Sequence, residues 1–317
     1  MSRRGKISLT FLKILVSCLL LYWLATLADF TTVRRTLAAA SPGTIVIASG
    51  MILFAFLTGA LRWWLLLRHS TQGIPLLRVL PSYYLGIFFN NILPTTMGGD
   101  AVRTIHLGLR GIGVKALVGS AVMDRGVGLL VVLGMGVVCA PFAPEIALAA
   151  RDKLLLAGTA AMMLAGISLL FNKGFLNFTQ RLSMKYQNTR VRRFLLDTLR
   201  LCHSYRTAHG KLLAATGLTV FMQSSVILSY YMLGRTVGIP LSLITYFSII
   251  PLVFLAGAFP VSLGGIGMRE GALVALLAAF GIDTQTAVTL SLLYLFAHLA
   301  SSLPGGLVIL FGRLQRQ

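Results

Sequence analysis

Acidic residues are scarce in this chain, and charged residues of either sign are few. Only 8 of its 317 residues are Asp or Glu and 28 are Lys or Arg, so charged residues make up 11% of the sequence. Soluble domains carry about a quarter charged residues, whereas this chain is 56% hydrophobic and has a mean hydropathy of +0.84. These proportions exclude an ordinary soluble domain and predict an integral membrane protein.

Groups that carry enzyme chemistry are also few. Cys18 and Cys139 lie in apolar runs and Cys202 in a basic segment, which matches neither a disulfide framework nor a metal site. His106 and His298 are isolated in the sequence. No nucleophile with an adjacent base, no nucleotide-binding loop and no paired carboxylates stand out. We therefore expect no enzyme activity, no cofactor and no bound metal.

The surplus of basic residues gives a formal net charge of +20. In a membrane protein such a surplus is typical of the cytoplasmic face, where it lies against anionic lipid. We therefore expect membrane lipids, and not nucleic acid, as the partner of the basic surface.

Apolar runs long enough to cross the bilayer recur along the chain. A span needs about 20 residues, and such runs lie at 7–28, 43–67, 116–140, 154–171, 212–233 and 286–311. Two shorter runs, 80–93 and 243–259, each end in a proline followed by a double glycine. The sequence predicts an all-α, polytopic membrane protein with about six full spans in a single membrane domain, 1–317.

The distribution of basic residues predicts the orientation. Segment 172–211 carries nine Lys or Arg against one acid, Asp197, and has apolar residues at helical spacing, so we expect a basic amphipathic segment on the cytoplasmic side. The basic ends of the chain predict two cytoplasmic termini, although Arg34 and Arg35 then lie outside. The first apolar run resembles a signal peptide, but its length and the lack of a clear cleavage site favour an uncleaved span. With six spans, both termini are cytoplasmic only if 79–113 and 241–282 are re-entrant hairpins.

One motif occurs twice. Pro94 and Pro260 are 166 positions apart, and each begins the pattern P-x-x-x-G-G-x-x-x-R, which ends at Arg103 or Arg269. The same shift relates the flanking apolar runs, so we predict two repeats of span, hairpin and span, at 43–140 and 209–311. Because one span, 154–171, lies between them, the repeats are inverted. Inverted repeats with broken helices are typical of alternating-access transporters.

The chemistry of the motif suits an anion site. Proline ends the incoming half-helix, and the glycines allow a turn and a close approach of backbones. The N-terminus of the next half-helix, with the motif arginine one turn on, would attract an anion. Alternatively, the glycines only allow tight helix packing.

Charged residues within the membrane are candidates for function because they are costly in hydrocarbon. They are Arg62, Asp100, Arg103, Asp124, Arg125, Arg269 and Glu270. Four positive and three negative groups leave a formal +1, which fits one phosphate or phosphodiester. Arginine suits this role because its guanidinium can hold two phosphate oxygens.

Alternatives remain for several of these side chains. Asp124 either pairs with Arg103 or Arg62 or carries protons, and Arg62 either takes part in the site or extends to the membrane surface. Glu270 is our first choice for proton coupling, with Asp124 the other candidate. Asn90 and Asn91 either cap the broken helix or bind a head group. We expect five further polar residues to pack at interfaces: Tyr83, Tyr84, Gln223, Tyr230 and Tyr231.

The segments "FFNNILPTTMGGDAVR" and "FPVSLGGIGMREGAL" resemble the lysylphosphatidylglycerol synthase transmembrane family, also called flippase-like membrane proteins, over about 10–310. Members include the membrane half of the bacterial multiple peptide resistance factor, which flips aminoacylated phospholipid, and stand-alone proteins linked to polyprenyl-phosphate sugars or hopanoids. The resemblance implies that the hairpin residues line a lipid path: Asn91, Pro94, Gly98, Gly99, Asp100, Arg103, Gly264, Gly265, Arg269 and Glu270. The chain ends at Gln317 without a soluble aminoacyl-transferase domain, so we do not expect synthesis of aminoacyl lipid.

Together these features predict a multi-pass transporter of the bacterial inner membrane. We expect it to move an anionic phospholipid or a polyprenyl-phosphate-linked sugar between leaflets by alternating access. The main alternative is a carrier for a small soluble anion or metabolite. A membrane enzyme or a non-transporting assembly partner is a further alternative, and the oligomeric state is left open.

Overall fold

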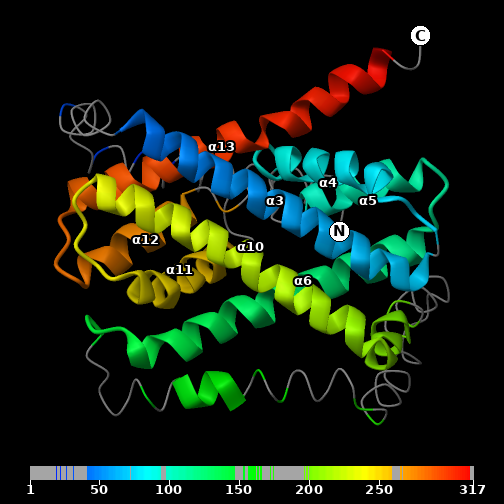
Figure 1. Cartoon of the computed structure of the whole chain (residues 1–317), viewed down its shortest axis with the longest axis horizontal. Helices are drawn as coiled ribbons and strands as arrows, with labels where there is room; N and C mark the ends of the chain where they lie inside the picture. Colours follow the sequence, from blue (N-terminus) through cyan, green and yellow to red (C-terminus); the bar gives the residue numbers. More distant parts are fainter. Residues whose placement is uncertain are drawn as a thin grey trace.

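The computed structural model describes most of the helical membrane region (Figure 1). The described residues are 19, 22, 26, 31, 41–71, 73–93, 98–146, 153, 156–161, 163, 165, 172, 174, 196, 198, 200–258, 265 and 267–314. They form helices and connecting turns, and none of them belongs to a β-strand. The predicted all-α class is confirmed for these residues.

Four long helices have the length and hydropathy of membrane spans. They are α3 (Pro42–Ser70), α6 (Val114–Cys139), α10 (His209–Thr236) and α13 (Thr284–Leu314). The shortest has 26 residues and is about 39 Å long at about 1.5 Å per residue, which exceeds a hydrocarbon core of about 30 Å. Four of the six predicted spans therefore correspond to helices, and the protein is an integral multi-pass membrane protein. The runs 7–28 and 154–171 lie largely outside the described residues, so the total of six stays a prediction.

Four short helices lie between the long ones. They are α4 (Leu76–Asn90), α5 (Gly98–Gly108), α11 (Leu243–Ala258) and α12 (Met268–Ala278). The longest has 16 residues, about 24 Å, which is too short for a span. Helix α4 packs against α5, and α11 packs against α12, so each pair forms a helical hairpin. Gly98 and Gly99 begin α5 and Gly265 lies in the turn before α12, so the described motif glycines lie where helices break, as the sequence predicted.

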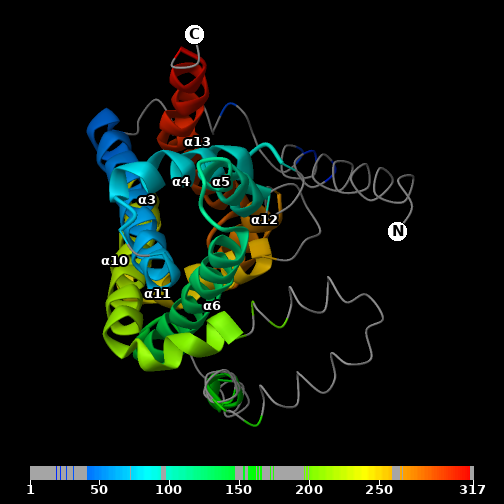
Figure 2. The ribbon, with the colours of Figure 1, turned by 90° about the vertical axis from the view of Figure 1, so that its right-hand side faces the viewer.

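The two hairpins begin at opposite ends of the bundle. Helices α3 and α10 lie side by side and run in opposite directions, and α4 follows the end of α3 whereas α11 follows the end of α10 (Figure 1). The α4/α5 hairpin packs against α3 and α13, and α11 packs against α6 and α10 (Figure 2). Whether each hairpin is re-entrant in the bilayer stays a prediction, as do the repeat boundaries 43–140 and 209–311.

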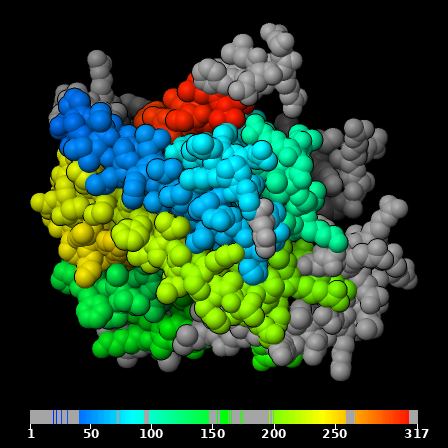
Figure 3. Space-filling view, turned by 45° about the vertical axis from the view of Figure 1, so that its right-hand side comes forward, coloured from blue at the N-terminus to red at the C-terminus, as the bar shows by residue number. Residues whose placement is uncertain are grey.

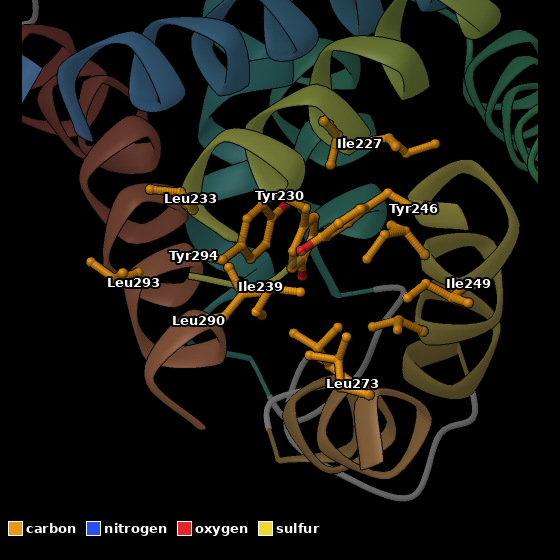
Figure 4. Close-up of a cluster of buried hydrophobic side chains, with 14 of the residues drawn as sticks. Ile227, Tyr230, Leu233, Ile239, Tyr246, Ile249, Leu273, Leu290, Leu293 and Tyr294 are labelled. Carbon is orange, nitrogen blue, oxygen red and sulfur yellow. The ribbon is translucent and has the colours of Figure 1, made fainter. Parts of the chain in front are cut away.

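The largest apolar core holds the second hairpin against α10 and α13. Tyr230 and Tyr294 stack with ring centroids 3.7 Å apart, and the ring of Tyr246 lies beside them (Figure 4). Large apolar side chains such as Phe221 and Phe296 are exposed on the outer surface. An exposed apolar surface of this kind suits a protein surrounded by lipid.

A carboxylate links the connection after α6 to the beginning of α11. Glu145 accepts hydrogen bonds from the Ser242 backbone N–H at 2.7 Å, from the Ser242 hydroxyl at 2.9 Å and from the Thr245 hydroxyl. Burial raises the pKa of Glu145, but these hydrogen bonds outweigh burial and hold the pKa below its usual 4.5. The link therefore favours the ionised carboxylate.

We expect Glu145→Ala to lower the free energy of unfolding by about 1–3 kcal/mol, because it leaves the Ser242 N–H without its acceptor. Glu145→Gln keeps one acceptor oxygen and should lose less. Thermal unfolding in detergent measures both. Because the folded pKa is depressed, the contribution is present above the unfolded pKa and disappears as the pH falls through the folded pKa. Equal midpoints for wild type and Glu145→Ala at neutral pH would contradict this role.

Candidate functional site

A cavity of about 440 Å³ lies where the two hairpins meet the long helices. Its apolar lining includes Phe56, Leu129, Val132 and Phe254. Its polar lining consists of Arg62, Tyr83, Asn90, Asn91, Asp100, Arg103, Asp124, Arg125, Gln223, Arg269 and His298. Eight of the predicted site residues are among them: Arg62, Asn90, Asn91, Asp100, Arg103, Asp124, Arg125 and Arg269.

The two motif arginines line this one cavity. Arg103 lies in α5, in the hairpin that begins at one end of the bundle, and Arg269 lies in the first turn of α12, in the hairpin that begins at the other end. They are 166 residues apart in sequence. The structure therefore brings the equivalent residues of the two motifs to the same space.

Asp124 pairs with two buried arginines. Its Oδ1 lies 2.6 Å from Arg62 Nε and its Oδ2 lies 2.9 Å from Arg103 Nη2, and all three residues are at most 5% exposed. Arg62 also donates a hydrogen bond to the Thr219 hydroxyl at 3.2 Å. The alternative in which Arg62 extends to the membrane surface is therefore wrong, because burial and pairing hold it in the bundle interior.

Asp100 extends this network to the rim of the cavity. It lies 2.9 Å from Arg103 Nη2 and 2.5 Å from Arg125 Nε. Arg125 is half exposed, and Leu129, one turn further along α6, is 46% exposed. Since both residues also line the cavity, the cavity reaches the exposed face of α6.

Aromatic rings fix the guanidinium of Arg103. Its Cζ lies 4.3 Å from the ring centroid of Trp63 and 5.1 Å from that of Tyr83. Such cation–π contacts add to the two ion pairs of Arg103. Its Nε is buried and, among the described atoms, has no hydrogen-bond partner. A buried donor of this kind costs free energy unless an acceptor reaches it.

The first hairpin depends on a close contact between its two helices. A Cβ atom on Gly99 would lie 2.0 Å from the carbonyl oxygen of Gly86, so only glycine allows this approach. The Asn90 amide oxygen accepts a hydrogen bond from the Gly99 N–H at 2.8 Å, while Asn91 donates to the Ser302 hydroxyl at 3.0 Å. Asn90 thus binds the first turn of α5, and Asn91 ties the hairpin to α13.

The second hairpin uses its motif residues differently. Gly265 has a φ of 86°, a conformation that glycine adopts readily. The side chain of Arg269 passes over Gly257, where a Cβ atom would lie 2.5 Å from Arg269 Cγ. Glu270 accepts a hydrogen bond from the Gly267 N–H at 2.6 Å and so binds the N-terminus of its own helix, α12.

Several predicted site residues do not line the cavity. These are Gly98, Gly99, Gly265 and Glu270, and Gly264, Pro94 and Pro260 lie outside the described residues. Without Glu270, the cavity has four arginines and two aspartates, a formal charge of +2 in place of the predicted +1. Proton coupling through Glu270 stays a prediction. Of the two coupling candidates, only Asp124 lines the cavity.

Sequence reasoning missed the other three polar residues of the lining, Tyr83, Gln223 and His298, and also its apolar residues, such as Phe56. Tyr83 and Gln223 were expected to pack at interfaces, His298 was set aside as isolated, and Phe56 lies in a uniformly apolar run. A polar side chain inside an apolar span was the available signal for Gln223 and His298. Among the described residues, no three His, Cys, Asp or Glu side chains form a group that could hold a metal ion.

Comparison with protein families identifies a match over most of the chain. The model described as "Lysylphosphatidylglycerol synthase TM region" matches residues 10–305, which covers seven of the four long and four short helices completely and α13 as far as residue 305. No curated protein is similar enough to give a match. The family is a membrane domain, which agrees with the four spans and with a role in the membrane. The chain therefore belongs to the lysylphosphatidylglycerol synthase transmembrane family.

Proposed function

We propose that this protein is a lipid transporter that moves a phosphate-bearing lipid head group between the leaflets of the bacterial inner membrane. The observation that carries the proposal is the cavity in which Arg103 and Arg269, from opposite hairpins, lie with a formal surplus of two positive charges. Arginine can hold two phosphate oxygens at once, and its charge is retained inside the membrane.

The lining of the cavity supports a lipid as the cargo. Apolar residues such as Val132 and Phe254 lie beside the charged ones, and the rim at Arg125 and Leu129 reaches the exposed face of α6. A lipid needs both features, because its head group has to enter the polar cavity while its chains stay in hydrocarbon. Either an anionic phospholipid or a polyprenyl-phosphate-linked sugar meets this description, and we propose no enzyme activity.

A carrier for a small soluble anion is the second candidate. The volume of about 440 Å³ lies within the range of small-molecule sites, about 300–1,000 Å³. Uptake of a radiolabelled soluble anion by proteoliposomes, without movement of lipid, would favour this candidate.

The proposal predicts a specific pattern of lipid movement in proteoliposomes. Arg103→Ala and Arg269→Ala should each slow the exchange of a fluorescent anionic lipid between leaflets by about tenfold to a hundredfold, because each removes a charge-assisted contact. Lysine at either position should restore only part of the rate, since it lacks the planar fork. Dithionite quenching of the outer-leaflet label measures the exchange.

The matched control is Arg235→Ala, at the exposed end of α10 and outside the cavity, which should exchange lipid at the wild-type rate. Wild-type exchange in both motif variants, with intact insertion, would leave the two arginines as structural residues only.

Alternating access and proton coupling are further parts of the proposal. The hairpins begin at opposite ends of the bundle, which suits a site that opens to each side in turn. Glu270 and Asp124 remain the two acids proposed for coupling.

We propose that the end of the bundle where α3 ends and α10 begins faces the cytoplasm, together with both termini and the segment 172–211.

A further inference from the structure

A second cavity lies at one end of the bundle, apart from the central one. It measures about 490 Å³ and is lined by Leu65, Arg68 and His69 of α3, by Gly73 in the following turn and by Lys211 of α10. It shares no lining residue with the central cavity. Figure 3 shows the end of α3 against the beginning of α10 on the surface of the molecule.

Basic groups gather around this end cavity without an acid to balance them. Three of its five lining residues are Arg, His and Lys, and none is acidic. Within the part of the chain that the structure describes, neither Arg68 nor Lys211 pairs with a carboxylate. Bringing like charges together is unfavourable, so the arrangement calls for an anion.

The position of Lys211 strengthens this argument. Lys211 lies in the first turn of α10, where the helix dipole makes a cation unfavourable, and α10 begins at His209 without a side-chain cap. Its ammonium donates a hydrogen bond to the Arg68 carbonyl oxygen at 3.2 Å, which keeps it beside the cavity. A bound anion would offset both the local charge and the dipole.

The other two basic groups are also held in place. The Arg68 guanidinium lies 4.8 Å from the ring centroid of Trp64. The His69 ring lies 4.3 Å from that of Tyr205, and its Nε2 forms a hydrogen bond with the Ser204 hydroxyl at 2.9 Å. These contacts orient the basic groups before any ligand arrives, which lowers the entropic cost of binding.

The surrounding end of the bundle is basic as well. No Asp or Glu occurs in 64–71, 73–80, 104–118 or 200–216, the residues at the ends of α3 and α5 and the beginnings of α4, α6 and α10. Basic residues in these ranges are Arg68, Arg78, Arg110, Lys115, Arg200, Arg206 and Lys211. Basic pockets between membrane helices on one side of a bilayer bind anionic lipid head groups.

We propose that the end cavity binds the phosphate of an anionic lipid head group, between Arg68 of α3 and Lys211 of α10. The site is separate from the central cavity and does not depend on lipid transport through it. It holds one lipid at the end of the bundle, with the phosphate near both basic side chains.

Native mass spectrometry of protein in phosphatidylcholine micelles, titrated with phosphatidylglycerol, tests this site. Removing a basic side chain near the membrane surface should weaken anionic-lipid binding about fivefold. The double variant Arg68→Gln/Lys211→Gln should therefore weaken one phosphatidylglycerol site by about 30-fold. Arg68→Lys/Lys211→Arg, which keeps both charges, should stay within a few-fold of wild type.

Controls separate this site from the central cavity and from general charge effects. Arg235→Gln, on the same helix α10 but at its other end, and Arg269→Ala, in the central cavity, should both keep the end site. If the double variant unfolds, Arg68→Gln alone carries the test, because the Arg68 side chain is exposed and its loss should still weaken binding about fivefold.

Competition with inorganic phosphate shows whether the site recognises phosphate alone or the phosphate of a lipid. Displacement of phosphatidylglycerol by millimolar phosphate means that the site recognises phosphate alone, and undisturbed binding means that it requires the lipid. Equal phosphatidylglycerol affinity in wild type and in a folded Gln variant, Arg68→Gln/Lys211→Gln or Arg68→Gln alone, overturns the proposal. The same holds if Arg235→Gln weakens binding as much as the double variant does.

Discussion

Asp124→Asn should destabilise the folded protein by about 3–5 kcal/mol, the range for breaking a buried ion pair. Asp124 lies between Arg62 and Arg103, and the substitution leaves both buried guanidinium groups without their shared carboxylate. Arg103 keeps Asp100, whereas Arg62 keeps only the Thr219 hydroxyl as a described partner. Thermal unfolding of purified protein in one detergent measures the loss.

Two further variants show whether the loss of stability comes from the broken ion pairs or from removal of an acidic residue in general. Asp283→Asn should change stability by no more than about 0.5 kcal/mol, because Asp283 is exposed, it accepts a hydrogen bond from the Thr286 N–H at 3.0 Å near the beginning of α13, and asparagine caps helices equally well. Adding Arg62→Gln to Asp124→Asn should recover part of the loss, because one unpaired charge is removed. If Asp124→Asn unfolds at the wild-type temperature, the buried pairs contribute nothing to stability.

The second large effect is expected for Gly99→Ala, which places a Cβ atom 2.0 Å from the Gly86 carbonyl oxygen and 2.5 Å from Asn90 Cγ. Both obstacles belong to the opposite helix of the hairpin, and one of them is backbone, so the helices have to separate. We expect a loss of about 3 kcal/mol, the upper end for overpacking, and slower lipid exchange because α5 carries Arg103.

Gly126→Ala is the matched control, because this glycine also lies within a membrane helix and a Cβ atom there has no neighbour within 4 Å. It should be neutral or stabilising by up to about 1 kcal/mol, since alanine favours helix. Unfolding midpoints of both variants, with the exchange assay, give the comparison. Equal stability of the two alanine variants would mean that the hairpin tolerates separation of α4 and α5.

The substitutions at Asp124 and Gly99 both affect the position of α5 relative to the helices around it. The approach of Gly86 and Gly99 sets the distance between α4 and α5, and the ion pairs of Asp124 fix α5 to α3 and α6. Arg103 therefore depends on both. We infer that its position in the cavity is set before any ligand enters, which reduces the cost of ordering on binding.

The sequence by itself determined the membrane class, four of the spans and the location of the helix breaks. Each of these follows from local chemistry. A run of about 20 apolar residues favours hydrocarbon wherever it lies in the fold, and a proline with a double glycine disfavours continuous helix. The motif shift of 166 residues also predicted which residues are equivalent, and Arg103 and Arg269 do line one cavity.

Only the tertiary structure decided the partners of the buried charges. Arg62 and Asp124 are 62 residues apart, and their pairing depends on which faces of α3 and α6 meet. Hydropathy along the chain predicts which segments enter the membrane. It does not predict which way each side chain points around the helix axis. For the same reason, Glu270 could be predicted as an intramembrane acid, whereas its binding to the N-terminus of α12, away from the cavity lining, required the packed hairpin.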